Sequence, residues 1–327
     1  MQVARPWHKN RLPSSRGVSD HDLQLLRGFL STKHRYDATL IDISAAITNT
    51  AYHDRFHPVR EYLIGLKWDN VARLDFWLRD FLGVEDTPYT RACARKTLCA
   101  AVARVMRPGV KFDHVLILEG AQDVGKSTTV DILGGEWSSD SPVDPHNRDT
   151  VDAMQGRWII ELAEFEVARR TDEEALKAFI SRRVDRARLA YGRSTNEFPR
   201  QSIFIATKNP RADGTYLKDE TGNRRWWPVY CHPKSGVGGI QVDFKGLRGV
   251  RDMLFAEAVM RVAGKEDLSM DTVELKSAAR EAVSSRHAEH EWTEAVALWL
   301  ERCDAGGVET RREFLTVHEI FADALGG

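Results

Sequence analysis

The sequence has few cysteines, no long apolar run and almost no net charge. Its four cysteines are scattered along 327 residues without Cys-x-x-Cys spacing, which argues against a disulfide framework and favours a reducing, cytoplasmic setting. No stretch approaches the roughly 20 apolar residues of a membrane span, and residues 1–20 lack the apolar core of a secretory signal. Lys and Arg total 47 and Asp and Glu total 48, which gives a formal net charge of −1. This balance excludes a globally basic nucleic-acid binder but leaves room for a local basic patch.

The spacing of apolar residues divides the chain into four predicted regions. Residues 1–18 are expected to form a flexible tail, and residues 19–110, with apolar residues at helical spacing, a helical N-terminal domain. Residues 111–250 alternate short apolar runs with helical segments, which predicts an α/β domain with a mostly parallel sheet that ends in a glycine-rich loop over 236–250. Residues 251–327 return to helical spacing and predict a small helical C-terminal region.

The segment from Gly120 to Ser127 matches the pattern G-x-x-x-x-G-K-[ST] in full. An apolar run precedes it and a helical segment follows, which favours a phosphate-binding loop over the alternative, a glycine-rich turn that matches by chance. In such a loop the backbone N–H groups point at phosphate, Lys126 reaches the β and γ phosphates, and the Ser127 hydroxyl can ligate Mg²⁺. We therefore expect residues 111–250 to be a P-loop ATPase domain that uses ATP and Mg²⁺. The candidate nucleotide-binding residues are Gly120, Ala121, Gln122, Asp123, Val124, Gly125, Lys126, Ser127 and Thr128.

A phosphate loop of this kind works with a carboxylate at the end of a neighbouring strand. The apolar run Trp158–Ile160 is followed by Glu161 and Glu164. We assign Glu161 to the Mg²⁺ side and Glu164 to polarising the attacking water, with the identity of the catalytic base left open between them. Because residues i and i+3 of a strand point to opposite faces, this assignment requires the chain to turn after Leu162. The alternative is that one or both are solvated loop acids.

Two further polar segments are candidates for the reaction. The third apolar run, over 203–206, ends in polar residues, and Asn209 could hold the attacking water near the γ-phosphate; the alternative is a turn formed with Pro210. Arg224 and Arg225 precede an aromatic segment, and one guanidinium could stabilise charge in phosphoryl transfer from a neighbouring subunit. The alternative is that both arginines bond local carboxylates.

A basic stretch lies between 176 and 193. It contains six basic residues and one acid, Asp185, so its local charge is 6 − 1 = +5 in a nearly neutral protein, and Tyr191 could stack on a base. Such stretches are more often solvated faces or subunit contacts, and Arg188 and Arg193 could also serve the nucleotide. The candidate DNA-binding residues are Lys177, Arg182, Arg183, Arg186, Arg188 and Arg193.

The sequence resembles the virulence-associated protein E family of phages and pathogenicity islands, which is related to the superfamily 3 helicases and to satellite-phage primase-helicases. The resemblance runs from about His57 to Tyr230. Its most specific segments are Trp-Ile-Ile-Glu-Leu-Ala-Glu over 158–164 and Leu-Lys-Asp-Glu-Thr-Gly-Asn-Arg-Arg-Trp-Trp-Pro-Val over 217–229.

The resemblance implies an AAA+-like ATPase core that works as a ring, expected to be a hexamer. The glycine-rich loop takes the Walker A place, Glu161 and Glu164 the Walker B place, and Asn209 the sensor place. Arg224 or Arg225 takes the arginine-finger place, and the basic stretch lies where superfamily 3 helicases carry DNA-contacting residues. The separation of the two acids departs from the adjacent pair that many such enzymes have.

These patterns together predict an ATP-dependent DNA helicase or translocase that acts in replication of a phage or other mobile element. The expected partners are single-stranded or forked DNA, further copies of the chain and other replication proteins, with no membrane. Two alternatives stay open: a P-loop phosphotransferase acting on a small molecule, and a nucleotide-gated DNA-binding scaffold without unwinding activity.

Overall fold

A computed structural model describes most of the chain. The described residues are 18–53, 56–147, 149–163, 173–187, 195–209, 223–232, 235–236, 239–240 and 242–286. The chain divides into two compact units, Met1–Tyr62 and Leu63–Gly327, and each is described by itself. The predicted tail over 1–17 and the predicted helical segments beyond residue 286 lie outside the described residues. None of the helices in the described part is long and apolar enough to cross a membrane.

The first unit contains two helices, α1 (Asp20–His34) and α2 (Leu40–His53), which pack against each other. Ser19 begins α1 with a capping box, in which its hydroxyl accepts from the Asp22 N–H and the Asp22 carboxylate accepts from the Ser19 N–H. This pairing explains why an aspartate, Asp22, is one of the few buried side chains in these helices. Helix α3 (Pro58–Gly65) spans the division between the two units.

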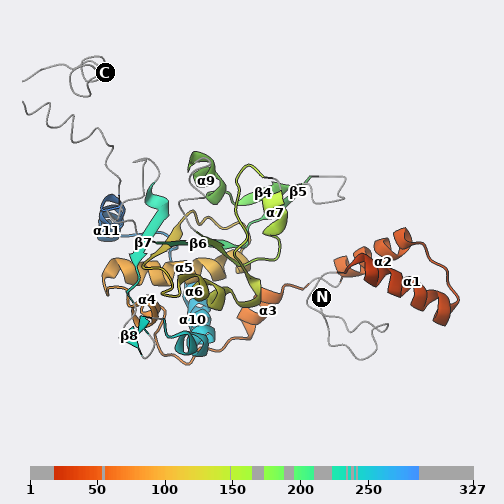
Figure 1. Ribbon diagram of the computed structural model, residues 1–327, viewed down its shortest axis with the longest axis horizontal. Helices are drawn as coiled ribbons and strands as arrows, with labels where there is room; N and C mark the ends of the chain where they lie inside the picture. Colours follow the sequence, from red (N-terminus) through yellow and green to blue (C-terminus); the bar gives the residue numbers. More distant parts are fainter. Residues whose placement is uncertain are drawn as a thin grey trace, which may run out of the picture. The chain divides into compact units, whose positions relative to one another are not determined.

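The second unit is built on a five-stranded sheet. Its strands are β1 (Val115–Glu119), β2 (Ser138–Ser139), β3 (Ile159–Leu162), β6 (Ile203–Lys208) and β7 (Trp226–Tyr230), in the order β2-β3-β6-β1-β7 (Figure 1). Every neighbouring pair is parallel. This confirms the predicted α/β class with a parallel sheet. Since all five carboxyl ends meet at one edge, polar residues that follow different strands are brought close together there.

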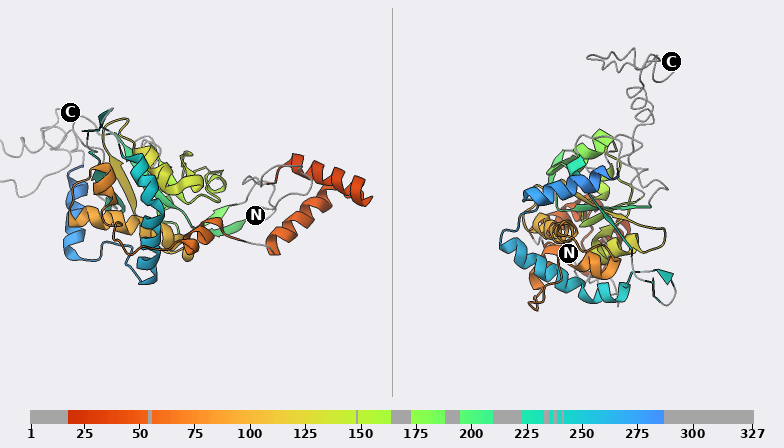
Figure 2. Two further views of the ribbon diagram at one scale, coloured as in Figure 1. Left: turned by 90° about the horizontal axis from the view of Figure 1, so that it is seen from below. Right: turned by 90° about the vertical axis from the view of Figure 1, so that its left-hand side faces the viewer.

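Helices cover both faces of this sheet (Figure 2). The long helices α5 (Pro88–Met106) and α10 (Phe244–Ala263) pack together, and α6 (Lys126–Gly134) lies against α10 and β3. On the other face, α7 (Asp149–Ala153), α9 (Glu173–Ile180) and α11 (Val273–Ser284) contribute apolar side chains to one buried cluster with alternate residues of β1, β3 and β6. The strands are therefore buried on both sides, as their uninterrupted apolar runs predict.

Short elements complete the unit. They are α4 (Trp77–Leu82), the 3₁₀ turns η1 (Gly135–Trp137) and η2 (Asn223–Arg225), the antiparallel pair β4 (Val184–Ala187) and β5 (Asn196–Pro199), and the pair β8 (Ser235–Gly236) and β9 (Gly239–Ile240).

The unit boundaries do not follow the predicted regions. Helices α4 and α5 belong to the second unit, since α5 packs against α10, β1 and β6. The expected loop over 236–250 is wrong for its last part, because α10 begins at Phe244 and runs across residue 250. Asp243 caps this helix by accepting from the Gly246 N–H at 2.9 Å, so the glycines that suggested a loop lie in a helix. The four-part division stays a prediction.

Candidate nucleotide-binding site

The glycine-rich segment lies between the end of β1 and the start of α6, at the carboxyl edge of the sheet. Two neighbouring strand ends hold its first residues in place. The Gly120 N–H donates to the Lys208 carbonyl at 3.2 Å, and the Cys231 N–H donates to the Glu119 carbonyl at 2.6 Å. The loop is therefore anchored between the ends of β6 and β7. Burial raises the pKa of the Cys231 thiol to about 12, so this side chain stays neutral beside the loop.

Gly125 is required by the shape of the loop. Its φ is +97°, in the region that side chains with a Cβ adopt at a cost. A Cβ on this residue would also lie 2.7 Å from Cε1 of Phe244, the first residue of α10. Gly125 is the N-cap of α6 and has no side chain to satisfy the first helical N–H groups.

The N–H groups of the loop are available to a ligand. No hydrogen bond between described residues is donated by the backbone N–H groups of residues 121–125. These residues directly precede α6, whose N-terminus has no side-chain cap. Unsatisfied N–H groups and the dipole at a helix N-terminus both favour an anion.

Lys126 brings a cationic group to the same place. Its Nζ donates to the Gly120 carbonyl at 2.7 Å, to the Ala121 carbonyl at 2.6 Å and to Oδ1 of Asn209 at 3.0 Å. Burial lowers the pKa of Lys126, while the nearby Asp123 and Glu161 carboxylates oppose that shift. The structure thus brings Lys126 and Asn209, two of the predicted site residues, into direct contact.

The carboxylate of Glu161 accepts hydrogen bonds from two hydroxyl groups. Oε1 accepts from Oγ of Ser127 at 2.6 Å and from Oγ1 of Thr207 at 2.6 Å. Glu161 and Thr207 are both buried. The structure therefore brings Ser127 to Glu161, as predicted, and adds Thr207, which sequence reasoning missed. The strand register explains this contact: Glu161 is the partner of Ile205, and Thr207 stands two residues further along on the same face. No pattern in the sequence gives that register.

The groups present fit a nucleotide with Mg²⁺. Mg²⁺ prefers oxygen ligands and is usually bound by one or two protein oxygens together with phosphate and water. Ser127 and Glu161 supply a hydroxyl and a carboxylate beside the free N–H groups of the loop. Among the described residues, no group of three or more His, Cys, Asp or Glu side chains could hold a metal ion. A metal at this position would therefore need oxygens from bound phosphate and water.

Glu164 lies outside the described residues. Strand β3 ends at Leu162 and the chain turns at Ala163. The assignment of Glu161 and Glu164 to one site stays a prediction.

Arg224 and Arg225 lie at the opposite edge of the sheet. They form η2 directly before β7, whose first residue, Trp226, pairs with Val115 at the start of β1. The Arg224 side chain is 69% exposed, with Nη2 3.6 Å from the Asp113 carboxylate. Nε of Arg225 donates to the Ser181 hydroxyl at 2.9 Å. Neither arginine is brought to the loop of its own chain.

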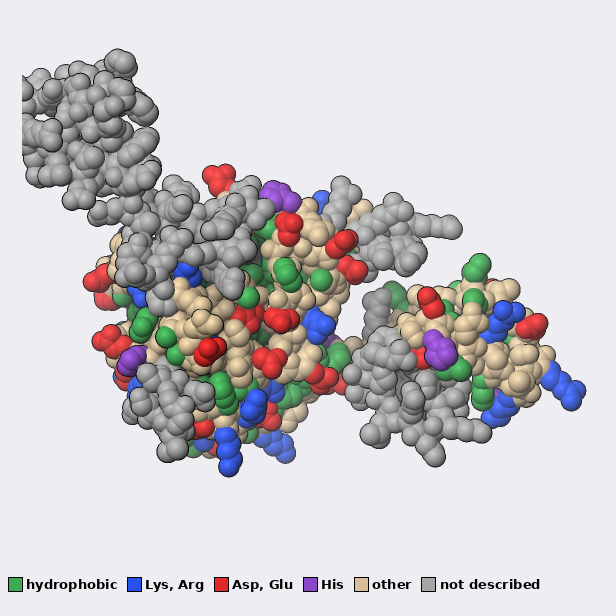
Figure 3. Space-filling model, viewed as in Figure 1, with side chains coloured by type: hydrophobic (Ala, Val, Ile, Leu, Met, Phe, Trp, Pro, Cys, Tyr) green, Lys and Arg blue, Asp and Glu red, His purple; other side chains and the backbone are tan. Residues whose placement is uncertain are grey.

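The candidate DNA-binding residues have different surroundings. Lys177 is buried in α9, whereas Arg182, Arg183 and Arg186 are exposed. Nε of Arg183 donates to the Gly109 carbonyl at 2.8 Å, and Nη2 of Arg186 lies 2.7 Å from the Glu197 carboxylate across the β4–β5 pair. Arg188 and Arg193 lie outside the described residues. On the face shown in Figure 3, acidic and basic side chains are interspersed.

Asp185, the acid of the basic stretch, has a structural partner. It is buried, and its carboxylate accepts from Nε of Arg200 at 2.9 Å and from the Nη2 of the same guanidinium. Because the Arg200 guanidinium neutralises the charge of Asp185, this carboxylate does not reduce the positive charge of the exposed arginines around it.

One contact beside the loop joins residues far apart in the sequence. Nε of Arg286, just after α11, donates to both carboxylate oxygens of Glu119, at 2.8 and 2.9 Å. Glu119 is the last residue of β1 and is buried. The contact joins the residue just after α11 to the strand that precedes the loop.

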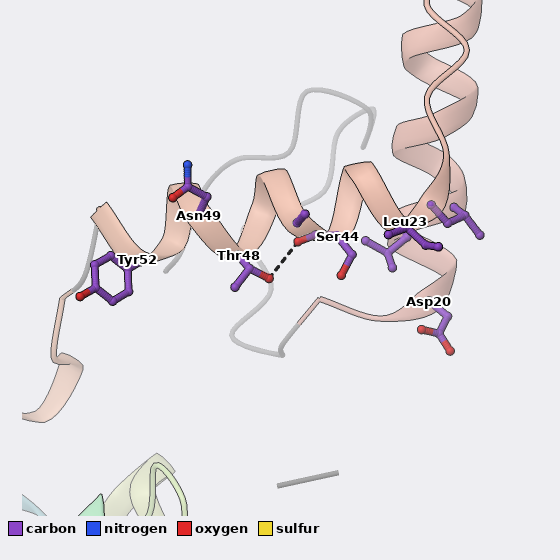
Figure 4. A pocket seen from close by; sticks show the side chains of 9 residues that line it. Asp20, Leu23, Ser44, Thr48, Asn49 and Tyr52 are labelled. Carbon is purple, nitrogen blue, oxygen red and sulfur yellow. Dashed lines mark hydrogen bonds between the residues drawn. The ribbon is translucent and has the colours of Figure 1, made fainter. Parts of the chain in front are cut away.

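A hollow on the first unit holds none of these groups. It is lined by α1 and α2 residues, among them Asp20, Leu23, Ser44, Thr48 and Tyr52 (Figure 4). The Thr48 hydroxyl donates to the Ser44 carbonyl at 2.8 Å, so this hydroxyl already has a partner within α2. The lining is mostly apolar with one carboxylate, and we assign no chemistry to it.

The fold is that of an α/β protein with a parallel sheet, and a glycine-rich loop lies at the carboxyl edge of that sheet. The model of the virulence-associated protein E-like domain matches residues 63–291, which is more than half of the chain. The protein belongs to this family, and the resemblance found in the sequence is confirmed.

Among solved structures, two of the NrS-1 C-terminal region, in an A form without ligand, are similar to the chain. Sequence identities are 15% and 14%, and TM-scores are 0.46 and 0.44. Each alignment covers 73% of this chain, but only 57% and 56% of the respective structures. The chain therefore spans little more than half of their length. A comparison with curated proteins gives no match.

Proposed function

We propose that the protein is an ATP-dependent motor, a DNA helicase or translocase, that acts in replication of a phage or other mobile element and has a P-loop NTPase core. One observation carries the proposal. Free backbone N–H groups, the Lys126 ammonium and the Ser127–Glu161 pair converge at the end of β1. Each of these groups has a separate use in binding a triphosphate with Mg²⁺.

Within this proposal the chain's own groups have distinct tasks. The N–H groups of residues 121–125 bind the phosphates, and Lys126 neutralises their charge. Ser127 and Glu161 would hold Mg²⁺, which would stabilise the negative charge that develops on the transferred phosphoryl group. Asn209, 3.0 Å from Nζ of Lys126, would hold the attacking water on the same side. Glu161 and Glu164 remain the two candidates for the catalytic base.

The proposal includes a second copy of the chain. Arg224 is exposed and stands at the edge of the sheet opposite the loop, so it cannot serve the loop of its own chain. In a ring, which we propose to be a hexamer, the Arg224 guanidinium could reach the loop of a neighbouring subunit. Of the two arginines, Arg224 is favoured because the Arg225 guanidinium donates to Ser181.

The proposed DNA contacts rest on the exposed arginines near β4 and β5. Arg182, Arg183 and Arg186 place three guanidinium groups on or just before this strand pair, and the family resemblance puts DNA contacts in the same part of the chain. Lys177 is buried and is therefore not proposed for a direct contact. Arg188 and Arg193 remain proposed from the sequence alone.

The experiment is a steady-state ATPase assay of the intact protein and of Lys126→Ala. We expect the substitution to lower turnover by at least about 100-fold, because it removes the cation at the site of charge development. Lys111→Ala, which removes an exposed lysine of the same unit, is the matched control and should keep wild-type turnover. Unchanged hydrolysis in folded Lys126→Ala would contradict the proposal.

Adding single-stranded DNA to the same assay separates the motor from its alternatives. Stimulation supports a motor. Hydrolysis without any effect of DNA would favour a phosphotransferase, and nucleotide binding without hydrolysis would favour a scaffold.

A further inference from the structure

We propose that Thr207 is a positioning residue, which holds the Glu161 carboxylate in the orientation that binds Mg²⁺ when the nucleotide is present. The proposal rests on the function proposed above and adds a residue that the sequence did not suggest. Thr207 acts through Glu161 and has no assigned contact with nucleotide or metal.

The geometry singles out one carboxylate oxygen. Oε1 of Glu161 accepts from both Ser127 and Thr207, at 2.6 Å in each case. The terminal torsion of a glutamate is soft, so a single hydrogen bond leaves the carboxylate free to rotate. Two donors from different elements, α6 and β6, fix the position of Oε1. The other oxygen, Oε2, is then the one left for an ion.

The support for Thr207 is rigid. It stands on β6, a six-residue strand in which every residue is buried, and which is hydrogen-bonded between β3 and β1. Thr207 itself is 5% exposed. A threonine has a stiff side-chain torsion because its Cβ is branched. The hydroxyl therefore has a defined position before any ligand arrives.

The two donors are not equivalent. Ser127 belongs to the loop and helix that would receive the phosphates and the ion, so removing its hydroxyl removes a proposed metal ligand as well. Thr207 lies on β6, the strand beside β1, and its hydroxyl donates to the Glu161 carboxylate. Substitution of Thr207 therefore changes the orientation of Glu161 without removing the side chain of either proposed ligand, Ser127 or Glu161.

The test compares Thr207→Val, which has the same shape without the hydroxyl, with Thr207→Ser, which keeps the hydroxyl. Binding of a fluorescent ATP analogue is measured as Mg²⁺ is titrated, and again in EDTA. We expect Val to raise the half-saturating Mg²⁺ concentration by about 10- to 100-fold, as is typical when a residue supporting a metal ligand is removed. Ser should restore it to within about threefold, and affinity in EDTA should be equal in all three proteins.

The outcomes separate this inference from the function on which it rests. A wild-type Mg²⁺ dependence in Thr207→Val, with or without a lower melting temperature, would overturn the positioning role and leave the proposed ATPase intact. A wild-type protein that binds no nucleotide with Mg²⁺ would overturn both. If Thr207→Val does not fold, Thr207→Ala replaces it, and rescue by Ser is still required.

Discussion

At the residue scale, the loop depends on Gly125 for two separate reasons. Its backbone has φ +97°, and the Phe244 ring occupies the space that a side chain would need. Gly156 offers a contrast, since its φ is +74° but no atom lies within 4 Å of a Cβ built on it. Comparing the two positions separates backbone strain from the close approach of α10.

We expect Gly156→Ala to lower the free energy of unfolding by about 1 kcal/mol, the cost of the left-handed backbone alone. Gly125→Ala should cost more and should also weaken nucleotide binding, because the loop must shift away from Phe244. The measurement is urea unfolding of both variants.

A double-mutant cycle with Phe244→Ala tests the cause. In the Gly125→Ala background, removing the ring should cost less stability than it does in the wild type, because the clash is relieved. Strictly additive effects would show that the ring does not constrain Gly125.

At the element scale, helix α11 is joined to β1 by the Arg286–Glu119 ion pair. Glu119 is buried and Arg286 is 19% exposed, so the pair is well shielded from solvent. Removing the guanidinium from such a pair takes a charged partner away from a buried carboxylate, which costs more than the net contribution of the pair.

Arg286→Ala should therefore lower the free energy of unfolding by about 3 kcal/mol. Arg280→Ala, an exposed arginine of α11, is the control and should change stability by less than about 0.5 kcal/mol. Adding Glu119→Gln to Arg286→Ala should recover part of the loss. Equal effects of the two arginine substitutions would contradict a stabilising role of this ion pair.

The elements that the sequence predicts best are those set by local pattern. The apolar run before the glycine-rich loop and the runs at 158–160 and 203–206 form β1, β3 and β6, because each run is short, apolar and bounded by polar or glycine residues. The start of α10 was missed because Gly246 and Gly249 suggested a loop, whereas Asp243 caps a helix there.

The contacts in the candidate site likewise fall into those that the sequence pattern predicts and those that it does not. The convergence of Lys126, Ser127, Glu161 and Asn209 follows from motif and strand order. The Thr207 contact depends on strand register, and Arg286 meets Glu119 across 167 residues of sequence. The residue pattern within one segment does not show which residues of another segment it will contact. Both contacts could therefore be identified only from the structure.

At the scale of the whole molecule, the candidate site residues of the second unit lie at two opposite edges of its sheet. The loop lies at the carboxyl edge of the sheet, and Arg224 and Arg225 lie at the amino edge. A guanidinium at one edge can act at the loop only when another copy of the chain presents it. The proposed reaction thus requires assembly.

Mixing experiments test this requirement. Arg224→Ala and Lys126→Ala should each lose nearly all ATPase activity alone, since an arginine supplied by a neighbour contributes about 10³- to 10⁵-fold to turnover. A mixture of the two should regain activity, because an intact loop can meet an intact Arg224 from a different subunit. Activity of Arg224→Ala equal to that of the wild type would contradict the assignment of Arg224.

The central claim is that residues 120–127 bind the phosphates of ATP. A crystal structure with a non-hydrolysable ATP analogue and Mg²⁺ tests it most directly. We expect phosphate oxygens within about 3 Å of the loop N–H groups and of Nζ of Lys126, with the ion between the phosphates and the Ser127–Glu161 pair. A nucleotide bound elsewhere, with the Lys126 ammonium still on the carbonyls of Gly120 and Ala121, would contradict it.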